Sequence, residues 1–332
     1  MGIAPGMELM SLPVPWPAWL AGRVPADRPF TYRNARSAGV TDRQLAAALR
    51  AGHLLSPLRG VFHASHLADG LALRIACLRL VVPADAVITD RSAGWLHGAP
   101  MILAPNDHLR VPPVSMYRSR GYRLRNQATS SGERSFGLAD VVEIDGLRVT
   151  SKLRTTCDLG RLLHRDQAIA AMDSMMHVAD FQPEVLIVEA ERFRGQRGMR
   201  QLRALAPLVD ARSQSPGESI LRLRWLDCTT LPRPTPQLCV SGPDGLCYLD
   251  LGVEGLLYAA EYDGARWHGP EQRAHDQRRR GWLIRTGEWI IDVFVDSDIS
   301  GREQNAEARL IEGIARANRR LGSRAWRGQD RA

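Results

Sequence analysis

The sequence predicts a mixed α/β protein of several domains. Its 332 residues are enough for two or three domains of ordinary size. Helical and strand-like patterns alternate along the chain, and 44% hydrophobic with 24% charged residues is typical of folded proteins. The charge is uneven, because residues 1–200 carry a net charge of +7 and residues 201–332 only +1. This asymmetry suggests that the two parts have different functions.

Several classes of protein are excluded at this stage. No apolar run approaches the roughly 18 residues that span a bilayer, so we expect no membrane segment. The first twenty residues lack a basic start and contain Pro13, Pro15 and Pro17, which argues against a secretory signal. The five cysteines are scattered without a CxxC motif, which favours reduced, buried side chains and a cytoplasmic protein over a structural zinc site.

After a leader (residues 1–29), residues 30–66 show the order of a winged helix-turn-helix. A short helix over 32–38 precedes a second helix, which Thr41 and Gln44 begin as a capping box. Two short strands joined by a turn follow as the wing. This order predicts a small DNA-binding domain.

The charge of this region supports the same interpretation, since residues 28–65 contain six arginines and one acidic residue. In such a domain the second helix enters the major groove. Arg43 and Gln44, at its N-terminal end, are expected to face base edges, whereas Arg50 and Arg59 are expected to contact phosphates. A solvated basic face on a protein-binding domain is the alternative.

Residues 67–210 predict a central α/β domain. Asp145-Gly146 marks a hairpin within 141–150, and helices are expected over 151–163 and 166–179. The stretch 110–134 carries a net charge of +5 and is expected to extend the nucleic-acid surface.

A linker of low hydrophobicity over 210–215 precedes the last unit, and a frayed tail is expected over 321–332. Between them the pattern predicts helices over 216–228, 271–285 and 303–320 and strands over 237–241, 247–252, 256–262 and 289–295.

Acidic residues stand on two of these strands. If the turn centres between Glu254 and Gly255, Asp250 lies opposite Ala259, and Asp250, Glu261 and Asp263 project from one face. Three such carboxylates repel one another, and Mg²⁺ or Mn²⁺ would relieve that repulsion and activate water against a phosphodiester. Strand ends that reach solvent are the alternative.

Two further residues are candidates for the same site. His268 is near enough in sequence to act as a general base or to orient a ligand. Glu218 either joins the carboxylates or completes a capping box with Ser215 and Pro216.

At these residues the last unit, 215–320, resembles the Vsr-like (very short patch repair) endonuclease branch of the PD-(D/E)XK superfamily, in particular its uncharacterised actinobacterial members. The resemblance rests on Pro216-Gly217-Glu218-Ser219, Tyr248-Leu249-Asp250, Glu261-Tyr262-Asp263-Gly264, Trp267-His268, Asp276, Arg279 and Gly287-Glu288-Trp289.

This resemblance implies a restriction-endonuclease-like α/β/α domain in which Asp250 is the central metal ligand. Glu261 and Asp263 stand where the superfamily has its (D/E)XK triplet, Glu218 matches its helix glutamate, and His268 matches the histidine after the tryptophan. The lysine of the triplet is absent, and residues 215–318 contain no lysine at all.

Residues 30–210 resemble the AbiEi-type antitoxin family of abortive-infection toxin–antitoxin systems. The matching residues are Arg43-Gln44-Leu45, Arg59-Gly60-Val61-Phe62, Arg91-Ser92-Ala93, Leu96-His97-Gly98, Asp145-Gly146 and Arg154-Thr155-Thr156-Cys157-Asp158-Leu159. In that family the winged helix binds operator DNA. The resemblance implies DNA as a partner, together with a cognate toxin or defence protein.

The two resemblances lead to one principal expectation and two alternatives. The principal one is a DNA-binding protein with a Mg²⁺-dependent endonuclease-like domain, acting in phage defence, a toxin–antitoxin system or DNA repair. One alternative is a non-enzymatic AbiEi-type transcriptional regulator with a degenerate nuclease fold, which the missing lysine favours. The other is a protein–protein adaptor.

Overall fold

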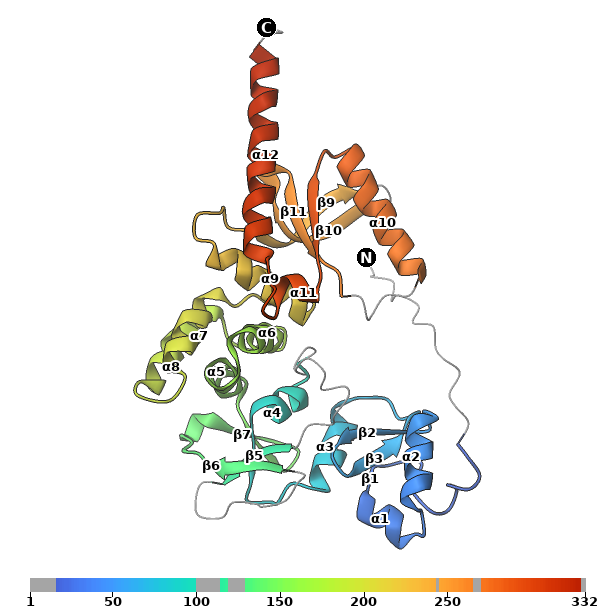
Figure 1. Ribbon diagram of the computed structural model, residues 1–332. Coiled ribbons are helices and arrows are strands. Elements are labelled where there is room, and N and C mark those ends of the chain that lie inside the picture. Colours follow the sequence, from blue (N-terminus) through green and yellow to red (C-terminus); the bar gives the residue numbers. More distant parts are fainter. Residues whose placement is uncertain (1–15, 100–113, 119–128, 243–244, 265–269, 330–332) are drawn as a thin grey trace. The chain divides into compact units, whose positions relative to one another are not determined.

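The chain is a mixed α/β protein, with three β-sheets among the residues that the structure describes (Figure 1). The computed structural model describes residues 16–99, 114–118, 129–242, 245–264 and 270–329. These residues group into two compact units, which meet in sequence between Thr155 and Thr156.

The first unit contains two of the sheets. Its elements are β1 (Phe30–Thr31), α1 (Tyr32–Ser37), α2 (Asp42–Arg50), β2 (Leu54–Leu58), β3 (Val61–Ala64), α3 (Leu71–Arg79), β4 (Val87–Ile88), α4 (Asp90–Leu96), β5 (Val114–Arg118), β6 (Thr129–Glu133), η1 (Leu138–Asp140), β7 (Val141–Ile144), β8 (Leu147–Thr150) and the start of α5 (Lys152–Leu162).

The start of this unit follows the predicted element order. Thr31 and Thr41 cap α1 and α2, each through a capping box. Strands β1, β3 and β2 form a three-stranded sheet in that order, and the β2–β3 hairpin is where the wing was predicted. Residues from both helices and all these strands share one core, which contains Leu20, Val24, Phe30, Ala35, Val40, Leu45, Ala48, Leu54 and Phe62.

A five-stranded sheet of order β6-β5-β4-β8-β7 completes the first unit. The predicted hairpin is confirmed, with Asp145 (φ 46°) and Gly146 (φ 78°) in its turn. The strands predicted near 109–111 and 121–124 lie outside the described residues. Strands β5 and β6 were not predicted; β6 is a short polar segment without apolar alternation, and in β5 the alternation of Val114 and Met116 extends over only a few residues.

The second unit starts within α5. Its further elements are α6 (Arg165–Met176), α7 (Pro183–Ala190), η2 (Glu191–Phe193), α8 (Met199–Leu205), η3 (Ala206–Leu208), α9 (Pro216–Asp227), β9 (Thr235–Gly242), β10 (Gly245–Val253), η4 (Glu254–Leu256), β11 (Tyr258–Tyr262), α10 (Pro270–Arg285), β12 (Ile290–Phe294), α11 (Asp296–Ile299) and α12 (Ala306–Gln329).

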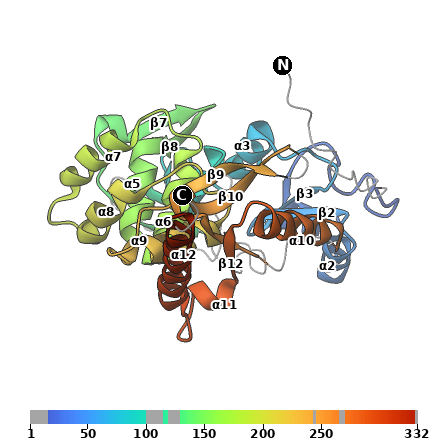
Figure 2. The ribbon, with the colours of Figure 1, turned by 90° about the horizontal axis from the view of Figure 1, so that it is seen from above.

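Helices cover both faces of the four-stranded sheet β12-β11-β10-β9 (Figures 1 and 2). Strands β9, β10 and β11 are antiparallel, and β12 runs parallel to β11. On one face, Leu251 and Tyr258 pack with residues of α9 and α12. On the other, Leu249 and Ala259 pack with Leu283 of α10.

The segment predicted as a linker is packed rather than extended. The backbone N–H of Asp210 donates to Asp173 Oδ1 at 2.8 Å, and a ring nitrogen of His177 lies 2.8 Å from the carbonyl oxygen of Ser213. Helix α9 packs directly against α6. The predicted boundary near residue 210 therefore falls inside one compact unit, because linker residues here bind the buried Asp173 of α6 and His177 just after it.

The C-terminal helix is longer than predicted, since α12 continues beyond Leu321 to Gln329. Among the described residues, no helix combines the length and the apolar character needed to cross a membrane.

Candidate functional site

The pairing of β10 with β11 differs from the predicted register by two residues. Gly252, and not Asp250, lies opposite Ala259, because the connection centres one residue later, on η4. One further step along this register places Asp250 opposite Glu261. A shift of two residues preserves the alternation of faces, so the two carboxylates remain neighbours.

Strand pairing is interrupted at Asp250. The ladder between β9 and β10 pairs Leu249 and Leu251 but not the residue between them, and Gln237, at that point of β9, has φ 49°. Leu249 packs toward α10 and Leu251 toward α12, although a regular strand would point both to one face. Irregular pairing of this kind re-aims side chains and is frequent beside active sites.

Helix α9 brings Glu218 to this interruption. Ser215 Oγ accepts a hydrogen bond from the Glu218 N–H at 3.1 Å, and Pro216 occupies the first turn, so the predicted cap is present. The Glu218 carboxylate is used differently: its Oε2 accepts from the Gln214 N–H at 2.8 Å and from Gln237 Nε2 at 3.0 Å. Burial raises the pKa of Glu218.

The glycine before Glu218 permits this close approach. A Cβ atom at Gly217 would lie 2.0 Å from the Tyr262 ring, so only glycine lets the first turn of α9 pack on the end of β11. The Pro216-Gly217-Glu218 sequence therefore has three separate tasks: starting the helix, contacting β11 and supplying a carboxylate.

Asp250 is the least compensated of the carboxylates. Its Oδ2 accepts one hydrogen bond, from the Tyr262 N–H at 2.8 Å. Burial, followed by the nearby charges of Glu218 and Glu261, raises the pKa of Asp250 to about 8, against the opposing effects of the Tyr262 N–H and Arg279. Three acidic side chains, from α9, β10 and β11, therefore influence one another by charge repulsion in a site that is largely shielded from water.

Glu261, only 1% exposed, is held by two arginines of α10. Arg279 Nη2 donates to Glu261 Oε1 at 2.9 Å, and Arg280 Nε donates to Oε2. Arg279 Nη1 also donates to the Tyr248 carbonyl oxygen at 2.7 Å. Arg280 Nη1 lies 3.7 Å from Oδ2 of Asp263, which is only partly buried.

The donors are of the type that Mg²⁺ prefers, namely carboxylate oxygens. Their present arrangement is not a ready cation site: in the part of the chain that the structure describes, no three His, Cys, Asp or Glu side chains are placed to hold one metal ion. Glu261 has both oxygens occupied by guanidinium groups. His268 lies outside the described residues.

The four residues predicted to contact DNA lie on α2 and in the turn after β2. The side chains of Arg43, Arg50 and Arg59 are exposed. Gln44 is committed in part to the capping box, because its Oε1 accepts from the Thr41 N–H at 2.9 Å. Arg50 Nε donates to a backbone carbonyl of its own helix at 3.3 Å.

The second basic stretch, 110–134, is described only over 114–118 and 129–134. Within it Arg134 pairs with Asp90 at 2.8 Å and stacks on the ring of Tyr117. Arg134 is therefore bound within the protein. The side chains of the other five arginines of the stretch lie outside the described residues.

Sequence reasoning missed the roles of Arg280, Gln237 and Gly217. The sequence signal for Arg280 was the run Arg278-Arg279-Arg280, because a helix that carries three consecutive arginines can place at least one of them against an acidic strand. The positive φ of Gln237 and the contact of Gly217 depend on tertiary packing and leave no local pattern.

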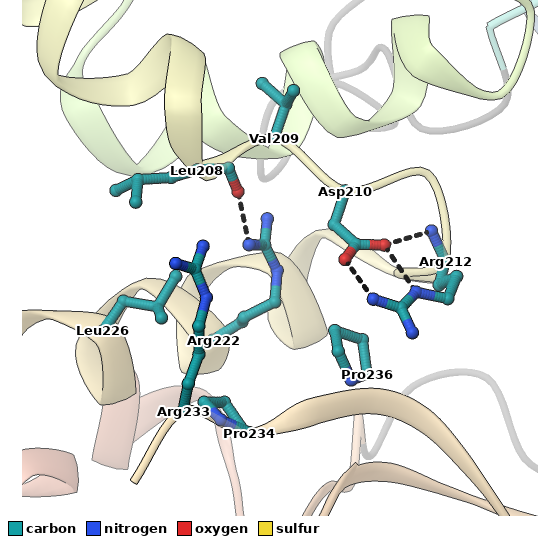
Figure 3. A pocket seen from close by; sticks show the side chains of 9 residues that line it. All are labelled: Leu208, Val209, Asp210, Arg212, Arg222, Leu226, Arg233, Pro234 and Pro236. Carbon is teal, nitrogen blue, oxygen red and sulfur yellow. Dashed lines mark hydrogen bonds and ion pairs between the residues drawn. The ribbon is translucent and has the colours of Figure 1, made fainter. Parts of the chain in front are cut away.

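A pocket of about 150 Å³ lies elsewhere in the second unit (Figure 3). The segment 208–212, α9 and the start of β9 line it. Arg222 donates to the Leu208 carbonyl oxygen, and Arg212 pairs with Asp210 at 2.7 Å. Arg222 and Arg212 are therefore engaged with groups of the chain, and none of the four predicted carboxylates lines the pocket.

Comparison with known proteins identifies two relatives without a stated function. No protein-family model matches the chain. It is 27% identical over 281 residues to the uncharacterized proteins MT2308 and Rv2248 of two Mycobacterium tuberculosis strains, CDC 1551 / Oshkosh and H37Rv. The similarity covers 84% of this chain and 98% of each relative, so it extends into both units.

Proposed function

We propose that this chain is a DNA-binding protein whose second unit contains a metal-dependent endonuclease site. The observation that carries the proposal is the group formed by Glu218, Asp250 and Glu261. These carboxylates come from three different elements and influence one another at a point where the pairing of β10 is interrupted. Buried acids that repel one another destabilise a fold, and such groups are concentrated at functional sites.

The chemistry fits hydrolysis of a phosphodiester bond. Carboxylate oxygens are the usual ligands of Mg²⁺ and Mn²⁺, ions that stabilise charge on phosphate oxygens and lower the pKa of bound water. The four-stranded sheet packs against α10 on one face and against α9 and α12 on the other. This layering supports the restriction-endonuclease-like assignment. We retain His268 as the candidate general base.

The first unit supports the DNA-binding part of the proposal. Helices α1 and α2 with the β2–β3 hairpin have the order of a winged helix-turn-helix, and this region carries five excess positive charges. Arg43 is exposed near the start of α2, where such domains contact bases. The proposal places the protein in the cytoplasm, with a cognate toxin or defence protein as a further partner.

Cleavage assays with the full chain test the enzymatic part. Duplex, mismatched and single-stranded DNA are incubated with Mg²⁺ or Mn²⁺, and we expect cleavage of at least one substrate that Asp250→Asn abolishes. Glu254→Gln, an exposed acid in the connection after β10, is the matched control and should retain activity. Cleavage that survives Asp250→Asn, or no cleavage of any substrate, would contradict the proposal.

One observation favours a second candidate, a non-enzymatic transcriptional regulator with a degenerate nuclease fold. Glu261 is already neutralised by Arg279 and Arg280, as expected if the carboxylates no longer bind a metal ion. This candidate predicts preferential binding to the protein's own promoter, with a steep salt dependence from arginine–phosphate contacts. Gel shifts with equal affinity for promoter and random DNA would exclude it.

A further inference from the structure

The arginines of the site are distributed unevenly between Glu261 and Asp250. Two guanidinium groups hold this carboxylate, while Asp250 has no arginine or lysine partner among the described residues. The arginines are therefore concentrated on Glu261, the most buried of these acids, and Asp250 lies beside them without one.

The two arginines are placed so that they can exchange partners. Their side chains are 20% (Arg279) and 18% (Arg280) exposed, whereas the side chain of Glu261 is 2% exposed. Arg279 has a buried Nε without a hydrogen-bond partner among the described atoms. Arginine binds phosphate through the same forked geometry that it uses for carboxylates. A phosphate at the outer side of the pair would compete directly with Glu261.

We propose that Arg279 and Arg280 form the phosphate-binding element of the site and switch from Glu261 to a DNA phosphate when substrate binds. The switch leaves both oxygens of Glu261 free of these arginines, so that Glu261 and Asp250 become two carboxylates of the kind that bind a divalent cation together with substrate phosphate and water. This inference rests on the proposed function and specifies its order: the metal site is completed only when the phosphate is present.

Reciprocal coupling between the two ligands follows. If DNA draws the arginines from Glu261, it must strengthen metal binding, and the metal must strengthen DNA binding by the same factor. We expect this factor to be about tenfold, within the range usual for coupled sites. The absent lysine of the triplet is then replaced functionally by two cations from α10.

Binding measurements on the full chain test the coupling. Mn²⁺ is titrated by calorimetry with and without a short DNA, and DNA affinity is measured by fluorescence anisotropy with and without Mn²⁺, with gels to check that the DNA stays intact. We expect each ligand to strengthen the other about tenfold in the wild type. Arg280→Gln should bind Mn²⁺ more tightly without DNA, bind DNA more weakly and lose most of the coupling.

Arg278→Gln is the matched control, because Arg278 is the exposed neighbour on the same helix. It should keep the Mn²⁺ affinity and the coupling of the wild type. Mn²⁺ binding and DNA cleavage without any coupling would overturn the inference and leave the proposed function intact. No Mn²⁺ binding by the wild type, with or without DNA, would overturn both.

Discussion

Two sets of buried arginine–carboxylate contacts in the second unit are built differently. Between α6 and α9, Asp173 pairs with Arg222 at 2.6 Å, and both side chains are at most 3% exposed. Between β11 and α10, Glu261 pairs with Arg279 and Arg280, which are about one-fifth exposed. The first set has one acid for each arginine, whereas the second lies among additional acids.

The surroundings of the two sets explain the difference. Asp173 also accepts from the Asp210 N–H, and Arg222 donates to the Leu208 carbonyl oxygen, so chain segments close around the pair. Burial raises the pKa of Asp173 as well as that of Asp250, but Arg222 opposes the rise at Asp173, whereas the charges of Glu218 and Glu261 add to the rise at Asp250. Removing one partner of a buried pair strongly destabilises a fold, whereas acids whose pKa is raised by neighbouring acids are concentrated at functional sites.

The largest expected effect comes from breaking the closed pair. Asp173→Ala leaves Arg222 buried without its counter-ion, which costs about 3–5 kcal/mol of unfolding free energy. Denaturant unfolding of the full chain measures the loss. A loss below about 1 kcal/mol, the usual range of exposed pairs, would show that this contact resembles a surface ion pair and would remove the contrast.

The second prediction is a gain in stability, because the carboxylates around Glu261 include Asp250, an acid without an arginine or lysine partner among the described residues. The pKa of Asp250 rises from 3.8 to about 8 on folding, so the folded state favours the neutral carboxyl. The wild type should lose stability as the pH rises between these two values. Asp250→Asn cannot ionise and should be more stable than the wild type, by an amount that grows with pH at up to about 1.4 kcal/mol per pH unit between these two values.

Thermal unfolding in a chelating buffer, from acidic to mildly alkaline pH, tests this difference. The two proteins should have similar stability below the unfolded-state pKa and diverge above it. Parallel pH profiles for the two proteins would mean that Asp250 is well compensated, and the contrast between the two sets would disappear.

Local signals allowed much of the second unit to be predicted from sequence. The Ser215-Pro216 start fixes α9, and the apolar strands around Asp250 and Glu261 fix β10 and β11, because caps and alternation act over a few residues. The register was wrong by two residues because η4 moved the centre of the turn. An even shift left the neighbouring carboxylates correct.

Tertiary contacts could not be obtained in this way. The side of α10 that faces the sheet depends on how the helix crosses it, so nothing in the run Arg278-Arg279-Arg280 identifies the residues that reach Glu261. Similarly, the polar composition of 210–215 predicts a linker, but Asp210 and Ser213 bind groups on α6 that are distant in sequence.

The third prediction concerns how Glu218 is positioned. Gly217→Ala places a methyl group against Tyr262, and the resulting shift of α9 should cost about 1–2 kcal/mol, as overpacking usually does. The same shift should reduce Mn²⁺ affinity in the presence of DNA. Gly255→Ala is the control, because a Cβ atom there meets open space. Equal behaviour of the two variants would contradict the packing role of Gly217.

The smallest effect is expected at an exposed pair whose hydrogen-bond geometry is good. Arg203 donates to Glu191 through two hydrogen bonds of 2.8 and 2.7 Å, yet both side chains are more than half exposed. Water already solvates these charges, so Glu191→Gln should change the unfolding free energy by about 0.5 kcal/mol or less. Its loss should fall further in high salt, whereas that of Asp173→Ala should not. Equal losses at the two positions would show that burial does not separate the two kinds of pair.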